Sequence, residues 1–461
     1  MTTVRALVYL VTTLFFVYGV MRLRQPGTAR SGNTLAAVGM LLALIVTLVG
    51  VTIHHPLLLI LGLLVGGIIG ATSARLVPMT AMPQMVALFN GMGGGAAALV
   101  ASGDVLRVVP GSPGAADLII ALVDILIGAV SFSGSIIAFS KLNEWMTGRP
   151  ITYRGQRTVN AVLLGLLILA GAVLVITGEA SHGALFLAYV IGAVALGLLG
   201  VFPIGGGDMP VIISLLNSFT GLAVAATGFL LGNDVLIVAG TFVGASGAIL
   251  TQLMSRAMNR PIGNIVFGAF GKLQTQGGTQ AQGVVQQTNS EDVAILLSYA
   301  SSVVIVPGYG LAVARAQQEV KELMTRLEAK GVDVKFGIHP VAGRMPGHMN
   351  VLLAEVDIPY QKLYDMEAIN AEFSRTDVVL VVGANDVTNP DARTNPGSPI
   401  YGMPILNVDQ AQRVIVLKRS MNPGFAGIDN PLYLNPKCQM LFGDARQSLN
   451  NLLRALNEVV A

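Results

Sequence analysis

The stretch SSVVIVPGYGLAVARAQQEVKELMTRLEAKG, residues 301–331, decides the fold of the C-terminal part of the chain. Its first third is rich in β-branched residues and ends in glycines, which is typical of a buried strand followed by a tight turn. The remainder predicts an amphipathic helix that ends at Gly331. The turn reads Gly308-Tyr309-Gly310-Leu311-Ala-Val313, which is GxGxxG with valine at the third glycine. In this context the pattern predicts a dinucleotide-binding turn; the alternative reading is a tight turn without a ligand.

Strand-like and helix-like runs continue after this unit. VDVKFGIHP, DVVLVVGAND, MPILNVD and RVIVLKRS have strand character, and MEAINAEFSRT has helix character. Strands separated by helices form parallel, doubly wound sheets. We therefore predict a C-terminal α/β Rossmann-like domain over residues 291–461. Residues 258–290 include the Gly/Gln/Thr-rich run TQGGTQAQGVVQQTNS, which predicts a flexible linker.

The residues after the second strand indicate which dinucleotide is bound. An NAD site usually has an acid at the end of this strand, which holds the ribose hydroxyls. This chain has no acid there and instead carries Arg344 and His348. A later strand ends in Lys418-Arg419-Ser420, which suits the 2′-phosphate of NADP, although a solvated strand end would look the same. The two observations together favour NADP (NADPH).

The rest of the chain has the composition of a membrane protein. The 461 residues are 53% hydrophobic and 11% charged, with a mean hydropathy of +0.68, whereas globular domains carry about 25% charged residues. Residues 1–256 contain only seven of the 25 acids. A net charge of +3 gives no reason to expect nucleic-acid binding, and Cys438 is the single cysteine, so we expect neither a disulfide nor a metal site.

A transmembrane domain is predicted over residues 1–257, with about nine spanning helices. Each candidate has the ~20 apolar residues that a span requires. Arg22 and Arg24 follow the first run where a signal peptide would have a cleavage site, so we interpret it as a span. Loop arginines and lysines place the N-terminus outside and the C-terminal domain in the cytoplasm of a bacterial-type inner membrane. The predicted spans are 4–21, 33–53, 56–77, 81–101, 115–140, 158–177, 183–202, 208–231 and 234–256.

Two of the spans repeat one pattern, because Met82-Pro and Met209-Pro are each followed by an asparagine, Asn90 and Asn217. Polar groups inside spans are costly and commonly functional. We expect both amides to flank one proton path, although an interhelical hydrogen bond would equally explain Asn217. Asp208 precedes its span and suits a helix N-cap; it could also sense the soluble domain. Ser131, Ser133 and Ser135 alternate and are not expected to share a helix face.

The whole chain resembles the beta subunit family of proton-translocating NAD(P) transhydrogenases. The motifs that carry the resemblance are VPGYGLAVARAQ, AGRMPGHMNVLLAE, VGANDVTNP, LKRSMNPGFAGIDNPL, GGGDMPVIISLLNSFTG and GAVSFSGSIIAFSKL. The resemblance implies hydride exchange between NADH and NADP⁺ coupled to proton translocation. It also implies an alpha subunit that binds NAD, carries further transmembrane helices and joins this chain in a higher-order oligomer.

The resemblance assigns site residues motif by motif. Gly308 and Gly310 would lie at the pyrophosphate, Asp386 near the nicotinamide as the catalytic-site acid, and Lys418, Arg419 and Ser420 near the 2′-phosphate. Catalysis would then be positioning of two nicotinamide rings. The full predicted NADP set is Gly308, Tyr309, Gly310, Leu311, Val313, Arg344, Met345, Pro346, Gly347, His348, Gly383, Ala384, Asn385, Asp386, Lys418, Arg419, Ser420, Asn422, Gly424, Phe425, Ala426 and Gly427; the predicted proton path is Asn90, Asp208 and Asn217.

Asn90 departs from the family, in which many members have a histidine at this position. Histidine titrates near physiological pH and an amide does not. We expect the titrating group to come from a partner's helix. The alternative is that protons move through water hydrogen-bonded to Asn90 and Asn217. Asp124 falls in the fifth predicted span, where it could be a buried acid or lie near the end of the span. Two further readings of the whole chain are a nucleotide-gated channel or transporter and a membrane anchor with a structural nucleotide site.

Overall fold

The computed structural model divides into two compact units, Met1–Ile204 with Ile212–Thr251, and Gly205–Val211 with Gln252–Ala461. We call them the helical unit and the sheet unit. The domain boundaries given above remain predictions. The described residues are 2–23, 26–50, 55–78, 81–107, 114–147, 150–177, 183–259, 261–266, 284–345, 347–398, 400–424 and 426–458.

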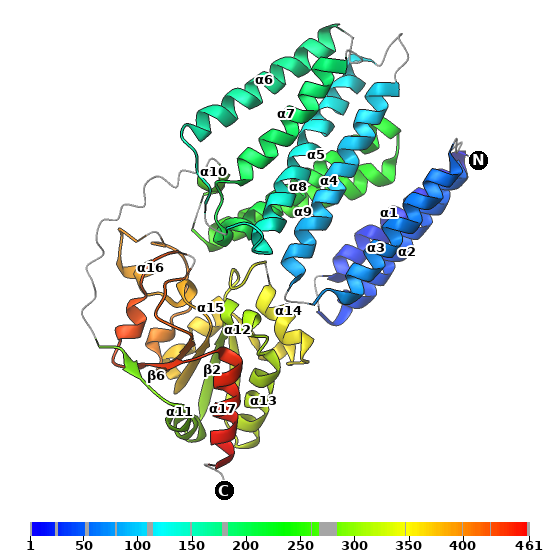
Figure 1. Ribbon diagram of the computed structural model, residues 1–461. Helices are drawn as coiled ribbons and strands as arrows, with labels where there is room; N and C mark the ends of the chain where they lie inside the picture. Colours follow the sequence, from blue (N-terminus) through cyan, green and yellow to red (C-terminus); the bar gives the residue numbers. More distant parts are fainter. Residues whose placement is uncertain are drawn as a thin grey trace. The chain divides into compact units, whose positions relative to one another are not determined.

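Within the described residues, nine helices are long and apolar enough to cross a membrane, which confirms the predicted spans (Figure 1). Two boundaries differ from the prediction by more than five residues. α2 begins at Pro26, a residue that favours the first turn of a helix, and α4 continues to Arg107. The helices are α1 (Thr2–Leu23), α2 (Pro26–Gly50), α3 (Pro56–Leu76), α4 (Met82–Arg107), α5 (Ala115–Leu142), α6 (Gln156–Thr177), α7 (Gly183–Val201), α8 (Met209–Leu231) and α9 (Asp234–Ala257).

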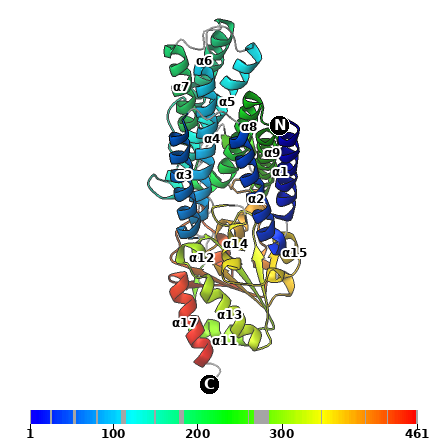
Figure 2. The ribbon, with the colours of Figure 1, turned by 90° about the vertical axis from the view of Figure 1, so that its right-hand side faces the viewer.

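Glycines allow these helices to approach closely. A Cβ on Gly94 of α4 would lie 2.9 Å from the carbonyl oxygen of Gly128 on α5. A Cβ on Gly221 of α8 would lie 2.2 Å from the backbone nitrogen of Gly244 on α9. Small residues have this role in lipid, where no hydrophobic force brings helices together. The helices α4 to α7 run side by side in both ribbon views (Figure 2).

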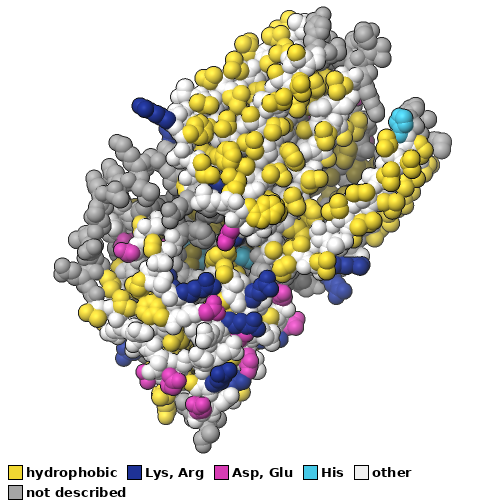
Figure 3. All heavy atoms as spheres, viewed as in Figure 1, with side chains coloured by type: hydrophobic (Ala, Val, Ile, Leu, Met, Phe, Trp, Pro, Cys, Tyr) yellow, Lys and Arg dark blue, Asp and Glu magenta, His cyan; other side chains and the backbone are white. Residues whose placement is uncertain are grey.

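The outward surface of the helical unit is apolar. α3 has no buried residue, and Ile68 and Leu57 expose 65% and 69% of their surface. In Figure 3 hydrophobic side chains cover most of the visible face of these helices, whereas lysine, arginine and acidic side chains gather on the sheet unit. An apolar surface of this extent is stable only against lipid or protein, so the chain is a multi-pass membrane protein.

The sheet unit contains a seven-stranded, fully parallel sheet in the order β1-β7-β6-β5-β2-β3-β4. It confirms the predicted Rossmann-like class. Its strands are β1 (Gln286–Gln287), β2 (Ser302–Pro307), β3 (Asp333–Ile338), β4 (Leu363–Asp365), β5 (Val378–Val382), β6 (Arg413–Lys418) and β7 (Cys438–Phe442). Its helices are α10 (Ile262–Val266), α11 (Ser290–Ser298), α12 (Tyr309–Ala314), α13 (Gln317–Ala329), α14 (His348–Glu355), α15 (Met366–Asn370), α16 (Asp391–Thr394) and α17 (Ala445–Glu458).

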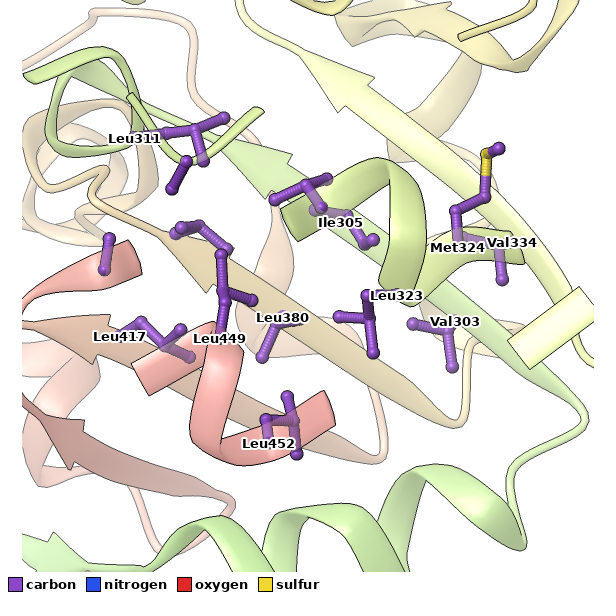
Figure 4. Close-up of a cluster of buried hydrophobic side chains, with 14 of the residues drawn as sticks. Val303, Ile305, Leu311, Leu323, Met324, Val334, Leu380, Leu417, Leu449 and Leu452 are labelled. Atoms are coloured by element: carbon purple, nitrogen blue, oxygen red, sulfur yellow. The ribbon is translucent and has the colours of Figure 1, made fainter. Parts of the chain in front are cut away.

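Both faces of the sheet are buried, which is the rule for parallel sheets. Val303 and Ile305 of β2 point to one face, where they join Leu323 of α13 and Leu449 of α17 in one apolar cluster (Figure 4). Their neighbour Val304 joins a second cluster with Phe373 and Tyr433. Strands that are hydrophobic at every position, rather than alternating, follow from this double burial.

Three local features differ from the sequence-based expectation. The helix after β2 is interrupted at Arg315, whose φ of +51° ends α12 before α13 begins. Residues 403–409, predicted as a strand, form none; Leu406 instead donates its backbone N–H to Val387 O. Gln286 and Gln287 lie inside the predicted linker, yet they pair with β7 and extend the sheet. Residues 267–283 of that linker lie outside the described residues.

Candidate nucleotide site and membrane polar network

The direction of strand order reverses between β2 and β5. From β2 the chain proceeds outward through β3 to β4, and from β5 outward through β6 to β7. In open α/β sheets the ligand crevice lies at this switch point, outside the carboxyl ends of the strands. The residues at these ends are Gly308 after β2 and Gly383 after β5. Both belong to the predicted nucleotide set.

The two loops at the switch point touch each other through their backbones. Gly308 N–H donates to Val382 O and Gly310 N–H donates to Gly383 O, both at 2.9 Å. A Cβ on Gly308 would lie 2.4 Å from Ala384 Cα, and one on Gly310 would lie 2.7 Å from Gly383 Cα. Gly383 itself has φ +68°, which favours glycine. The glycines of GxG are therefore required by the crossing of the loops.

The next two predicted residues of this turn differ in environment. Leu311 is fully buried in the core, whereas Val313 exposes 46% of its surface. Val313 occupies the position where a third glycine normally permits close packing of helix on strand. Because Val313 points to the surface, the fold has no need for glycine there.

The loop after β3 packs on the same turn. The Arg344 guanidinium lies 4.3 Å from the centroid of the Tyr309 ring. The backbone N–H of Arg344 donates to Nδ1 of His348 at 3.0 Å. Gly347, with φ +67°, precedes α14. The structure thus places the Arg344 guanidinium against Tyr309 of the glycine turn and His348 against the Arg344 backbone. Met345 is half-buried in the same loop, and Pro346 lies outside the described residues.

His348 is buried and electrically neutral. Burial, with a smaller contribution from the Arg344 charge, lowers the pKa of His348 to about 4. Because Nδ1 accepts a hydrogen bond, the proton of the neutral ring belongs on Nε2. Nε2 is buried without a hydrogen-bond partner among the described residues. The site therefore has one unused donor.

The loop after β5 provides a second unused donor. Asn385 Oδ1 accepts from Tyr433 Oη at 2.7 Å and from Asn430 Nδ2 at 3.1 Å. These two bonds fix the side-chain amide, so that Nδ2 of Asn385 is buried with no partner in the described residues. Asp386 follows, and its Oδ2 accepts from the backbone N–H of Ala426 at 2.9 Å.

The segment around Gly424 and Ala426 therefore packs onto Asp386. A Cβ on Gly424 would lie 2.6 Å from Asp386 Oδ1, so this approach requires glycine. Gly427 has φ +69° and no atom near its Cβ position, so it serves the turn. Phe425 lies outside the described residues. Asp386 holds this segment in place, which is a positioning role.

The basic residues at the end of β6, Lys418 and Arg419, contact different partners. Lys418 Nζ donates to Asn422 O and lies 5.0 Å from the centroid of the Tyr433 ring. Burial lowers the pKa of Lys418, and the charges of Asp386 and Asp429 oppose this change. Arg419 pairs with Asp444 at 3.2 Å, and Ser420 is exposed. Of the three residues predicted for the 2′-phosphate, only Lys418 contacts Tyr433, which also bonds Asn385 beside Asp386.

The helical unit contains a polar network centred on Asn90. Asn90 Nδ2 donates to Ser135 Oγ at 3.0 Å and to Ser131 Oγ at 3.3 Å. The Ser131 hydroxyl lies 2.5 Å from Thr220 Oγ1 and donates to Leu216 O at 2.9 Å. Thr220 in turn donates to Asn90 O at 3.3 Å. The network joins α4, α5 and α8.

The predicted proton-path residues are not all part of this network. Asn217 is half-buried and makes none of these bonds; Leu216 and Thr220 contact the α4–α5 pair instead. Asp208 is buried immediately before α8. As expected, the three serines do not share one helix face, although Ser131 and Ser135, four residues apart, both face Asn90. Only Ser133 points elsewhere, donating to Ala129 O of its own helix.

The fold and these sites define a class: a multi-span membrane protein with a parallel α/β domain of dinucleotide-binding topology. A family model described as NAD(P) transhydrogenase beta subunit matches residues 5–455. Two proteins named NAD(P) transhydrogenase subunit beta, both from Rhodospirillum rubrum and one of them from strain ATCC 11170, are each 46% identical to the chain over 458 residues, covering 97% of this chain and 98% of theirs.

The chain therefore belongs to the NAD(P) transhydrogenase beta subunit family. Membership supports an oxidoreductase role that uses nicotinamide nucleotides, and the family description as a subunit implies a partner.

Proposed function

We propose that this chain binds NADP(H) at the β2/β5 switch point and couples hydride transfer between NADH and NADP⁺ to proton translocation. The observation that carries the proposal is the crossing of the two glycine loops with unused donors beside it. His348 Nε2 and Asn385 Nδ2 are both buried and lack an acceptor among the described residues. His348 begins α14, after β3, and Asn385 lies in the loop after β5.

The donor set fits a phosphorylated dinucleotide. Unsatisfied buried donors cost free energy, and a ligand rich in acceptor oxygens removes that cost. The Gly308–Gly310 turn and Arg344 would hold the pyrophosphate, and Lys418, with Arg419 and Ser420, the 2′-phosphate. β3 ends at Ile338, and no acid lies at or directly after its end. This absence favours NADP over NAD.

Within this proposal the chain contributes binding and orientation. The bound nicotinamide supplies the hydride chemistry. Asp386 accepts a hydrogen bond from the backbone N–H of Ala426. The loop from Asn422 to Gly427 would cover the nucleotide and exclude water. The neutral His348 would donate a hydrogen bond, since its low pKa keeps it uncharged at pH 7. None of these side chains has to transfer a proton during hydride exchange.

The second nucleotide would come from the partner. The described residues form one parallel sheet of this kind. Hydride exchange requires two nicotinamide rings face to face, so an alpha subunit would present NAD(H) to this domain. We place the assembly, a higher-order oligomer, in a bacterial-type inner membrane, with the N-terminus outside and the sheet unit in the cytoplasm, as loop charges indicate.

Reconstituted vesicles test the proposal. The chain with its alpha subunit should transfer hydride from NADH to NADP⁺ and move protons across the membrane in the same preparation. Lys418→Ala should weaken NADPH binding, while Lys437→Ala, which alters a lysine bound to Ala411 O outside the proposed site, should not. Proton or ion flux gated by NADPH without any hydride transfer would favour the channel reading instead.

A further inference from the structure

A carboxylic acid lies inside the helical unit, on the helix that carries Ser131 and Ser135. Asp124 is ten residues into α5, about 14 Å along the helix from Ala115 at 1.5 Å per residue. Its side chain is completely buried. Thr227 of α8 donates its hydroxyl to Asp124 Oδ2 at 2.6 Å, and Asp124 Oδ1 has no hydrogen-bond partner among the described residues. The alternative of a position at the end of the span is therefore wrong.

The contact with Thr227 can serve both protonation states of the acid. Thr227 Oγ1 lies 2.6 Å from Asp124 Oδ2 and 3.1 Å from Ala223 O, but a hydroxyl has only one proton. When Asp124 is ionised, Thr227 donates to the carboxylate. When Asp124 is protonated at Oδ2, the carboxyl donates to Thr227 and the hydroxyl turns to Ala223 O. The geometry requires no backbone movement for either state.

Asp124 and the Asn90 network lie along one seam between α5 and α8. Asp124 precedes Ser131 by seven residues, and Thr227 follows Thr220 by seven, which is close to two helical turns in each case. The pairs Asp124–Thr227 and Ser131–Thr220 are therefore about 10 Å apart on the facing sides of antiparallel helices. The hydroxyls of this seam can rotate and reverse their donor direction.

The other titratable groups around this acid have no hydrogen bond to it. Lys141 donates to Phe202 O and Ile204 O at the far end of α5, and Tyr189 donates to Leu122 O. The titratable residues on the surrounding helices are Asp104 and Arg107 on α4, Asp117 and Lys141 on α5, Arg157 on α6 and Tyr189 on α7, with none on α8.

We propose that Asp124 is the proton-binding group of this chain, exchanging its proton with the seam formed by Thr227, Thr220, Ser131 and Asn90. The proposal rests on the proton translocation proposed above. Ionisable residues inside membranes mark proton relays. It is an alternative to the expectation that a partner's helix provides the titrating group. A proton enters from water, forms the Oδ2–H bond of the carboxyl, and leaves to a few water molecules in the seam, with no oxidation or reduction.

Substitution in the reconstituted complex separates this role from packing. Asp124→Asn keeps an acceptor for Thr227 and loses the titratable group, so proton translocation should fall at least tenfold. Asp124→Glu keeps the carboxyl and should retain translocation within about threefold. Asp117→Asn, on an exposed position of the same helix, is the matched control and should behave as wild type. The yield and thermal unfolding of each purified complex report whether its helical unit has folded.

Every outcome decides. Wild-type vesicles that transfer hydride without moving protons would overturn the proposed function itself. Wild-type vesicles that move protons, with Asp124→Asn equally fast, would overturn the role of Asp124 alone. Equal loss in Asp124→Asn and Asp124→Glu at normal abundance would show a packing role. If Asp124→Asn does not accumulate, an infrared pH titration compares the wild type with Asp124→Glu. A carboxyl C=O band that differs in position between the two proteins supports the proposal. Identical bands contradict it.

Discussion

β5 and α3 have nearly the same kind of sequence and opposite surroundings. All five residues of β5, VVLVV, are buried, whereas none of the 21 residues of α3 is. In the sheet unit apolar side chains pack on each other, and in the helical unit many of them face outward. Polar function is consequently placed differently. The sheet unit carries it in loops at strand ends, and the helical unit carries it on side chains between helices.

Glycine also has a different role in the two units. Gly308 and Gly310 allow two loops to cross at a strand edge, where their backbone N–H groups bond the neighbouring loop. Gly94 and Gly128 bring α4 and α5 together along their length. The first use brings two loops together and the second brings two helices together. Each of the following predictions tests one side of this contrast.

The largest effect is expected for Gly308→Ala. The added Cβ would lie 2.4 Å from Ala384 Cα, which is backbone and cannot rotate away. The loops should separate, at a cost above the ~1–3 kcal/mol of ordinary overpacking, and NADPH affinity should fall at least 100-fold, or about 2.7 kcal/mol. Calorimetric titration of the full chain measures this. Gly397→Ala is the control, and Gly94→Ala should loosen the helical unit while leaving NADPH binding intact.

Acid should destabilise the sheet unit through its two buried histidines. Burial lowers the pKa of both His339 and His348 to about 4, from 6.5. Between these values the unfolded chain binds more protons, so stability is full above pH 6.5 and is lost as pH falls towards 4, by about 3 kcal/mol for each histidine at 1.36 kcal/mol per pKa unit.

Amide hydrogen exchange of peptides from β3, corrected for intrinsic pH dependence, should show this loss in the full chain. His339→Gln should reduce the slope of stability against pH, between pH 4 and 6.5, by roughly half. An unchanged slope in that variant would contradict the assignment. Peptides from α7 serve as the internal comparison, because the described residues of that helix contain no histidine and no carboxyl group.

Lys418→Ala should weaken NADPH binding about 10- to 100-fold, since charged hydrogen bonds contribute ~1.5–3 kcal/mol. NADH binding should change less than threefold, because NADH lacks the 2′-phosphate. Arg419→Ala should have the smaller effect of the two, since Arg419 already pairs with Asp444. Parallel titrations with both nucleotides measure the ratio, and equal losses for NADPH and NADH would refute a 2′-phosphate contact.

The smallest effect is expected in the membrane network. Ser131→Ala removes contacts with Asn90 and Thr220, and hydrogen bonds between membrane helices average ~0.6 kcal/mol. Proton translocation should slow about threefold. Ser140→Ala, which alters only a bond to Ile136 O of its own helix, is the control. Equal rates in both variants would remove Ser131 from the path.

Local pattern was enough to predict the nine helices, the parallel sheet and the glycine turn. Runs of apolar residues and the strand–glycine–helix order are properties of neighbouring residues, so one sequence contains them. The errors occurred where position depends on distant partners. Residues 403–409 look like a strand but find no neighbour in the sheet, and Gln286–Gln287 look like linker but pair with β7. Nothing local indicates that Ser131 and Ser135 would face Asn90.

The sequence by itself determined that this chain crosses a membrane and carries a dinucleotide-type turn, because hydrophobicity and glycine act within a few residues. Only the tertiary structure decided which polar groups meet. Asp124 and Thr227 are 103 residues apart, and Asn385 and Tyr433 are 48 apart. A buried carboxyl or amide finds its partner through the packing of whole helices and loops, and that packing placed a titratable group on the same seam as Asn90.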